Sequence, residues 1–100
     1  MEHHVYFWLK DEKKDDASRK AFEAGIEALY RVKSIESAIW GVPAKTPARP
    51  VTDHSWDYAL SVRFATLEDH DYYQDCKEHD DFIDAFKDWW AKVEVKDLQN

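Results

Sequence analysis

The clearest hydrophobic pattern of the chain lies between Tyr72 and Trp90. Apolar residues recur there every three or four positions, the spacing of a helix with one buried face. They follow His79 on that face and are Phe82, Ile83, Phe86, Trp89 and Trp90. The pattern predicts an amphipathic helix that ends at Trp90.

Two capping signals indicate that this region holds two helices rather than one. Thr66 and Asp69 form a T-x-x-D capping box before a helix that runs to Gln74, and Asp75 and Glu78 form a second box. Because each box marks the start of a helix, we expect a break in the helix near Asp75.

The first predicted strand, from His3 to Lys10, is apolar on both faces. Successive side chains of a strand point to opposite sides of the sheet. One side carries His3, Val5, Phe7 and Leu9, and the other carries His4, Tyr6 and Trp8. A strand that is apolar on both sides must be covered on both. We therefore expect helices on one face and a partner subunit on the other.

A further helix and three further strands complete the pattern. The helix is predicted over Ala17–Lys33, with Asp15 or Asp16 as N-cap, and the strands over Ser37–Val42, over Trp56–Phe64 and around residues 93–95. In the third strand the alternation places Trp56 on the buried face with Tyr58, Leu60, Val62 and Phe64. The predicted order is β-α-β-β-α-α-β.

Two local features add to this picture. Gly25 lies inside the first helix, where glycine costs about 1 kcal/mol relative to alanine, so we expect close packing of this helix on the sheet. All three prolines lie within residues 43–55, which predicts a loop there. That loop is either a lid or binding loop, or an irregular connection.

Composition limits the class of protein. A chain of 100 residues with 44% hydrophobic content predicts one domain over residues 1–100. The net charge of −7 disfavours nucleic acid and membrane surfaces as partners. Cys76 is the only cysteine, which excludes an intrachain disulfide, and no segment has the pattern of a signal peptide or membrane span. We expect a cytoplasmic protein.

The candidate chemistry lies on the two later helices. Tyr73 and His79 are six residues apart, so on one continuous helix they would point about 120° away from each other. A break between the helices would allow both side chains to face one cavity. A histidine in the first turn of a helix is favoured as neutral imidazole, which accepts a proton, and a tyrosine can hydrogen-bond an oxyanion. The alternative is a histidine that belongs to the core.

No other cluster predicts a site. The remaining histidines, His3, His4, His54 and His70, lack metal-binding spacings, so we expect no metal site. Cys76 has no base near it in sequence, and we interpret it as a packing residue. The chain has 15 aromatic residues, more than a small core normally needs. Either some of them line a ligand cavity or a subunit interface, or together they fill a crowded core.

Taken together, these residues resemble the stress-responsive dimeric α/β-barrel (Dabb) family. The resemblance rests on the opening HHVYFWLK, on Trp40-Gly41, on the WDYALSVRF strand, on Tyr73, on the His79-x-x-Phe82 step, and on the closing VEVKD that contains Asp97. The family histidine of the first strand corresponds to His3 or His4. The family's His-Pro-x-His step is replaced here by Cys76-Lys77-Glu78-His79.

The resemblance implies a ferredoxin-like α+β subunit with an antiparallel sheet, which packs on a second copy to form a homodimeric α/β barrel. In a similar branch, a plant polyketide cyclase, a Tyr and a His that match Tyr73 and His79 act in an aldol-type ring closure. The pocket between helices and sheet would be lined by His3, Val5, Phe7, Phe22, Ile26, Leu60, Val62, Phe82 and Trp90.

Three functions remain open at this point. The protein binds a small apolar or aromatic metabolite, with or without acid–base catalysis by His79 and Tyr73 and without a cofactor. Alternatively, it is a stress-response or structural homodimer with no ligand. Heme or quinone chemistry rests on fold analogy alone and ranks last.

Overall fold

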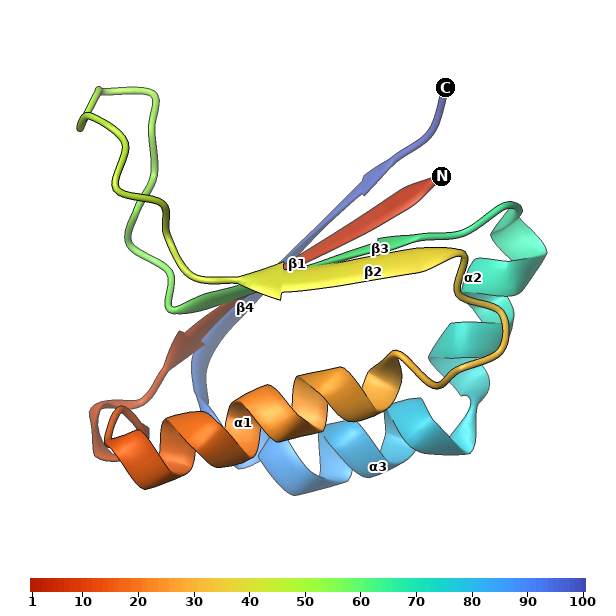
Figure 1. The fold of residues 1–100 in the computed structure, drawn as a ribbon, viewed down its shortest axis with the longest axis horizontal. Coiled ribbons are helices and arrows are strands. Elements are labelled where there is room, and N and C mark those ends of the chain that lie inside the picture. Colours follow the sequence, from red (N-terminus) through yellow and green to blue (C-terminus); the bar gives the residue numbers. More distant parts are fainter.

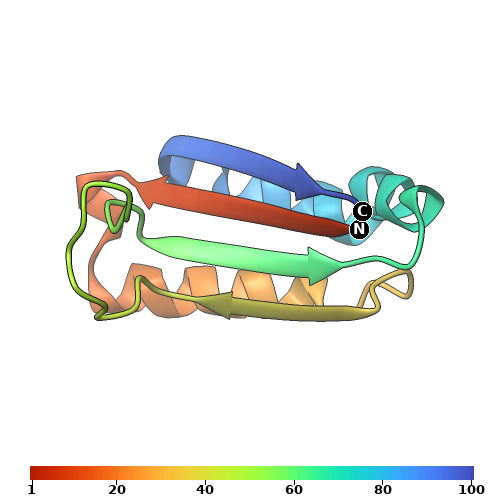
Figure 2. The same cartoon turned by 90° about the horizontal axis from the view of Figure 1, so that it is seen from above.

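Four strands form one antiparallel sheet in the computed structural model, which describes residues 1–100. The order across the sheet is β2-β3-β1-β4 (Figure 2). The strands are β1 (Glu2–Leu9), β2 (Ser37–Gly41), β3 (Tyr58–Arg63) and β4 (Trp90–Leu98). The central strand β1 pairs with both β3 and β4, so its residues contact neighbours on either side.

All three α-helices lie on one face of this sheet (Figure 1). They are α1 (Asp16–Leu29), α2 (Leu67–Asp75) and α3 (Lys77–Phe86), and two short 3₁₀ helices, η1 (Asp11–Lys13) and η2 (Lys87–Trp89), flank them. The element order confirms the predicted β-α-β-β-α-α-β arrangement. None of the helices has the length and hydropathy needed to cross a bilayer.

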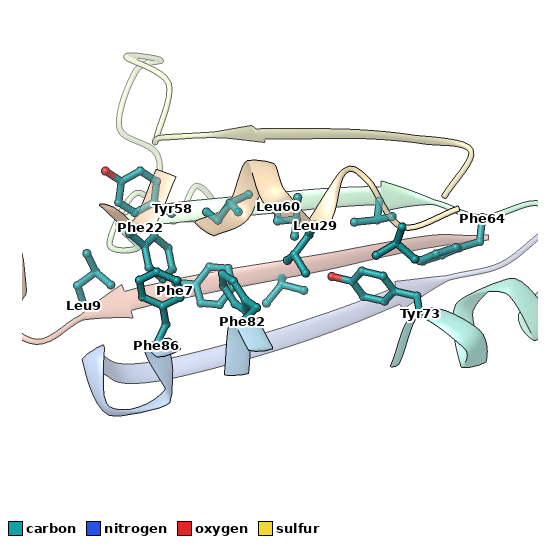
Figure 3. Packing of buried hydrophobic residues seen from close by; sticks show 14 residues of the cluster. Phe7, Leu9, Phe22, Leu29, Tyr58, Leu60, Phe64, Tyr73, Phe82 and Phe86 are labelled. Carbon is teal, nitrogen blue, oxygen red and sulfur yellow. The ribbon is translucent and has the colours of Figure 1, made fainter. Parts of the chain in front are cut away.

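The core fills the space between this helical layer and the sheet (Figure 3). Phe22 of α1 lies at its centre and is fully buried. It contacts five aromatic rings, those of Phe7, Tyr58, Phe82, Phe86 and Trp89, at centroid distances of 5.1 to 6.5 Å. The crowded aromatic core that the composition allowed is therefore present.

Helix α1 begins where the sequence predicts and ends earlier. The carboxylate of Asp15 accepts a hydrogen bond from the backbone N–H of Ser18, the expected N-cap interaction. The prediction that the helix continues to Lys33 is wrong, because it ends at Leu29. From Tyr30 the backbone N–H groups bond to carbonyls three residues back, which tightens the chain into turns.

The break between α2 and α3 is confirmed, but its predicted cause is wrong. Asp75 is the last residue of α2 rather than a cap, and the N-cap of α3 is Cys76, which makes no capping hydrogen bond with its side chain. Cys76 has extended backbone angles, φ −76° and ψ 161°. Its backbone N–H and its thiol both donate to the carbonyl oxygen of Tyr73, which ends α2.

Two aromatic residues differ from their predicted positions. Helix α3 ends at Phe86, and after η2 the chain reverses so that Trp90 opens β4 opposite Leu9. Trp56 precedes β3 and lies against Tyr6 on the other face of the sheet, with a ring-centroid distance of 5.5 Å. Both errors arise because periodicity alone does not show where a chain turns away from a surface.

Gly25 faces α3 rather than the sheet, which corrects the prediction from sequence. A Cβ atom at this position would lie 2.3 Å from Cε2 of the Phe86 ring. Glycine therefore allows α1 and α3 to approach closely.

The Gly25→Ala substitution is expected to destabilise the protein by about 1–2 kcal/mol. The displacement of the buried Phe86 ring outweighs the gain of about 1 kcal/mol in helix propensity. Urea denaturation measures this change. The matched Gly25→Ala, Phe86→Leu double variant should recover part of the loss, and equal stability of Gly25→Ala and the parent protein would contradict the close contact.

The face of the sheet opposite the helices is covered only in part. The loop between β2 and β3 rises over this face at one end (Figure 1), where the indole N–H of Trp8 donates to Ser55. Ile39 of β2 is 70% exposed. Helices thus cover one face of β1, as predicted, and the other face is only partly covered within this chain.

Candidate functional site

A small apolar cavity lies between the helices and the sheet, on the β4 side. Its volume is about 170 Å³, and ten of the thirteen side chains that line it are hydrophobic. Larger hollows are present at the strand ends and under the β2–β3 loop, but they are more open to solvent and more polar. The cavity is the hollow that contains both Tyr73 and His79.

Six of the nine predicted wall residues line this cavity. They are His3, Val5, Phe7, Leu60, Phe82 and Trp90. The other three, Phe22, Ile26 and Val62, are buried in the core behind it. The sequence reasoning missed five wall residues, which are Leu29, Gln74, Ile83, Val93 and Val95. Val93 and Val95 pair with Phe7 and Val5 across the β1–β4 ladder, so the strand alternation could have identified them.

The break at Cys76 brings Tyr73 and His79 together. Tyr73 is on the last turn of α2, and His79 is on the first turn of α3. Their rings meet edge to face with centroids 5.0 Å apart and an interplanar angle of 68°. Figure 3 shows the Tyr73 hydroxyl directed into the interior, toward Leu29. The two polar groups therefore share one apolar cavity.

The surroundings keep both groups neutral near pH 7. Tyr73 is only 2% exposed, and this burial raises the pKa of its hydroxyl well above the usual range. Burial is also the main cause that lowers the pKa of His79 below 6.5, against the opposing charges of Asp80 and Asp75. A neutral imidazole accepts a proton and a neutral phenol donates a hydrogen bond. The pair thus combines a base with a hydrogen-bond donor.

His3 is the histidine of β1 that faces the site. It is 5% exposed, and its Nδ1 lies 2.6 Å from Oδ1 of Asp97, its cross-strand partner on β4. Burial lowers the pKa of His3, although the hydrogen bond with Asp97 acts in the opposite direction. His4 lies on the other face of the sheet, beside Glu2. Of the two candidates for the strand histidine, only His3 lines the cavity.

His70 was not among the predicted site residues. Its ring lies 5.1 Å from that of His3, between centroids. One ring nitrogen of each histidine and a carboxylate oxygen of Asp97 all lie within 4.8 Å of one another, so these three residues could hold a metal ion. Sequence spacing could not reveal this set, because its members come from β1, α2 and β4.

The comparisons with known proteins agree with this architecture. The family model described as the stress responsive A/B barrel domain matches residues 1–100. The chain belongs to this family. A search of curated proteins finds no significant match.

Solved structures of other proteins share the fold of this chain, although their sequence identity to it is low. A protein of Arabidopsis thaliana is 18% identical with a TM-score of 0.80, over 99% of this chain and 93% of that one. A dimeric ferredoxin-like protein of unknown function from Thermobifida fusca is 12% identical with a TM-score of 0.75, over 95% and 85% of the two chains. A hydroxynitrile lyase from Passiflora edulis is 17% identical with a TM-score of 0.78, over 95% and 87%. The predicted ferredoxin-like α+β fold is confirmed.

Proposed function

We propose that this protein binds a small aromatic or apolar carbonyl compound in the cavity and that His79 and Tyr73 act on it as base and hydrogen-bond donor. The observation that carries this proposal is the position of two neutral, complementary polar groups at the wall of an otherwise apolar cavity. Pockets with few convergent polar groups on an apolar wall are typical of small-molecule sites.

The size of the cavity limits the ligand to about one aromatic ring. An engineered cavity of about 150 Å³ in another protein holds benzene, and the cavity here has about 170 Å³. The rings of Phe7, Phe82 and Trp90 can contact a ligand ring on several sides. Larger substituents would extend past Val93 and Val95, which are 36% and 49% exposed.

The proposed chemistry is addition or elimination at a carbonyl carbon. His79 would remove a proton from the ligand, and the Tyr73 hydroxyl would donate a hydrogen bond to the oxygen or leaving group that becomes negative. Aldol-type ring closure and cyanohydrin cleavage both belong to this class. The similar fold of the Passiflora edulis hydroxynitrile lyase supports the inclusion of cyanohydrins among the compounds to test.

Binding of acetophenone, measured by isothermal titration calorimetry, tests the ligand site. A Val93→Trp variant places a large side chain at the cavity wall, where it would occupy part of the space that the ligand ring needs. We expect the dissociation constant for acetophenone to rise at least about tenfold, which is a loss of about 1.4 kcal/mol of binding free energy. The matched control is Val42→Trp, an exposed valine outside the cavity. Equal affinity of all three proteins would place the binding outside this cavity, and no affinity in any of them would favour the homodimer without a ligand.

We further propose that two copies associate through the open sheet face. The exposed Ile39 side chain and the incompletely covered apolar face of β1 support this arrangement, and the similar Thermobifida fusca protein is described as dimeric.

The Ile39→Asp substitution is expected to raise the dissociation constant of the dimer about 100-fold, since an unpaired carboxylate at the interface costs several kcal/mol. Sedimentation equilibrium measures this dissociation constant. Leu67→Asp, at an exposed position on the helical side, is the control and should remain dimeric. A monomeric parent protein would refute the arrangement.

A further inference from the structure

Three potential metal ligands from distant parts of the chain converge beside the cavity. His3 comes from β1, His70 from α2 and Asp97 from β4, and one donor atom of each lies within 4.8 Å of the others. We propose that these side chains form a binding site for a divalent transition-metal cation of the zinc class. The site stands independently of the proposed acid–base function.

The donor set fits this class of cation. Imidazole nitrogen and carboxylate oxygen are common ligands of Zn²⁺, with metal–ligand distances of about 2.0–2.2 Å. Mg²⁺ and Ca²⁺ prefer oxygen ligands throughout. Two histidines and one carboxylate leave at least one coordination position for water or for a ligand, which is the arrangement of catalytic rather than structural zinc sites.

Two of the three side chains are already oriented by the fold. His3 is held by burial and by the antiparallel register that places it opposite Asp97. His70 has its Nδ1 at 3.2 Å from Oδ1 of Asp71, which leaves Nε2 for a metal. A carboxylate bonded to the second ring nitrogen is the usual way in which a metal-binding histidine is positioned. His70 also packs against Phe64, with ring centroids 5.6 Å apart.

Binding requires only small side-chain movements. Around a tetrahedral zinc ion, neighbouring ligand atoms lie about 3.3 Å apart, from bond lengths of about 2.0–2.1 Å. The distance between His3 Nδ1 and Asp97 Oδ1, now 2.6 Å, would lengthen slightly. The other distances between the donor atoms of the three residues, which are at most 4.8 Å, would shorten. The Asp97 side chain is 47% exposed, so it can move, and it provides a route for the ion from solvent.

The experiment is a calorimetric titration of Zn²⁺ into chelator-treated protein. We expect one ion per chain and at least a tenfold loss of affinity in His70→Ala. His70 is a partly exposed side chain, so its removal should leave the fold intact, as a thermal unfolding curve would verify. Two control variants remove histidines on the other side of the sheet, His4→Ala and His54→Ala, and should bind as the parent does.

Cobalt provides a second measurement that a nonspecific surface site would not reproduce. Co²⁺ in a site of low coordination number gives intense visible absorption, which should appear with the parent protein, disappear on addition of Zn²⁺, and be absent from Asp97→Asn and His70→Ala. Parent-like zinc affinity in His70→Ala, loss of affinity in a control variant, or no binding by the parent would each overturn the site. Because no turnover is measured, these outcomes are separate from a failure of the proposed function.

Discussion

Replacing His79 by glutamine is expected to slow cleavage of mandelonitrile, a cyanohydrin with one aromatic ring, by about 10²–10⁴-fold, the usual contribution of a general base. In this reaction the base takes the hydroxyl proton, the bond to the nitrile carbon breaks, and benzaldehyde and cyanide leave. Glutamine retains much of the size and polarity of histidine but cannot accept the proton. Release of benzaldehyde is followed by its ultraviolet absorbance.

Two further variants show whether His79 acts as a base or only shapes the cavity. Tyr73→Phe retains the ring against Phe64 and removes only the hydroxyl, so it should bind acetophenone and lose turnover. His54→Gln, in the loop on the opposite face, should retain full activity. Parent-like turnover by His79→Gln would exclude the catalytic part of the proposal and leave ligand binding intact.

The pH dependence gives an independent check with a defined sign. Burial lowers the pKa of His79, so the imidazole remains neutral, and able to accept a proton, at pH values somewhat below 6.5. The rate above the uncatalysed reaction should therefore change little from pH 8 to 7, and its fall on acidification should be centred below pH 6.5. Tyr73 stays protonated over this whole range because its pKa is raised. A rate that already falls between pH 8 and 7 would contradict this assignment.

Truncation of Phe22 to alanine is expected to lower the free energy of unfolding by about 3–5 kcal/mol, the range for a fully buried aromatic residue. Phe22 has no solvent exposure and contacts rings from the sheet, from α3 and from η2. Its loss would leave a cavity that these surrounding rings cannot fill without leaving their own contacts. Guanidinium denaturation followed by far-ultraviolet circular dichroism measures the change.

The matched control for Phe22→Ala is Leu67→Ala, at the exposed start of α2. Leu67 is 49% exposed, so its truncation should change the stability by less than about 0.5 kcal/mol. A small effect of Phe22→Ala would mean that the core relaxes around the missing ring. In that case Phe22 would not be central to the packing.

The sequence by itself determined the features that depend on local order. Strand patterns identified every strand, helical periodicity identified α1 and α3, and the capping signals identified α2 as a separate helix. The T-x-x-D box is present, with Thr66 accepting a hydrogen bond from the N–H of Asp69. The position of the helix break was correct to one residue, although the cap is Cys76 rather than Asp75. Local hydrogen bonds and side-chain periodicity act over a few residues, so the amino-acid order contains them directly.

Only the tertiary structure decided which side chains share the site. Phe22 and Leu29 lie on one face of α1, and yet only Leu29 reaches the cavity. The convergence of His3, His70 and Asp97 depends on the β1–β4 register and on where α2 lies over the sheet. These positions follow from the packing of helices against strands that are distant in sequence, and no spacing along the chain encodes them.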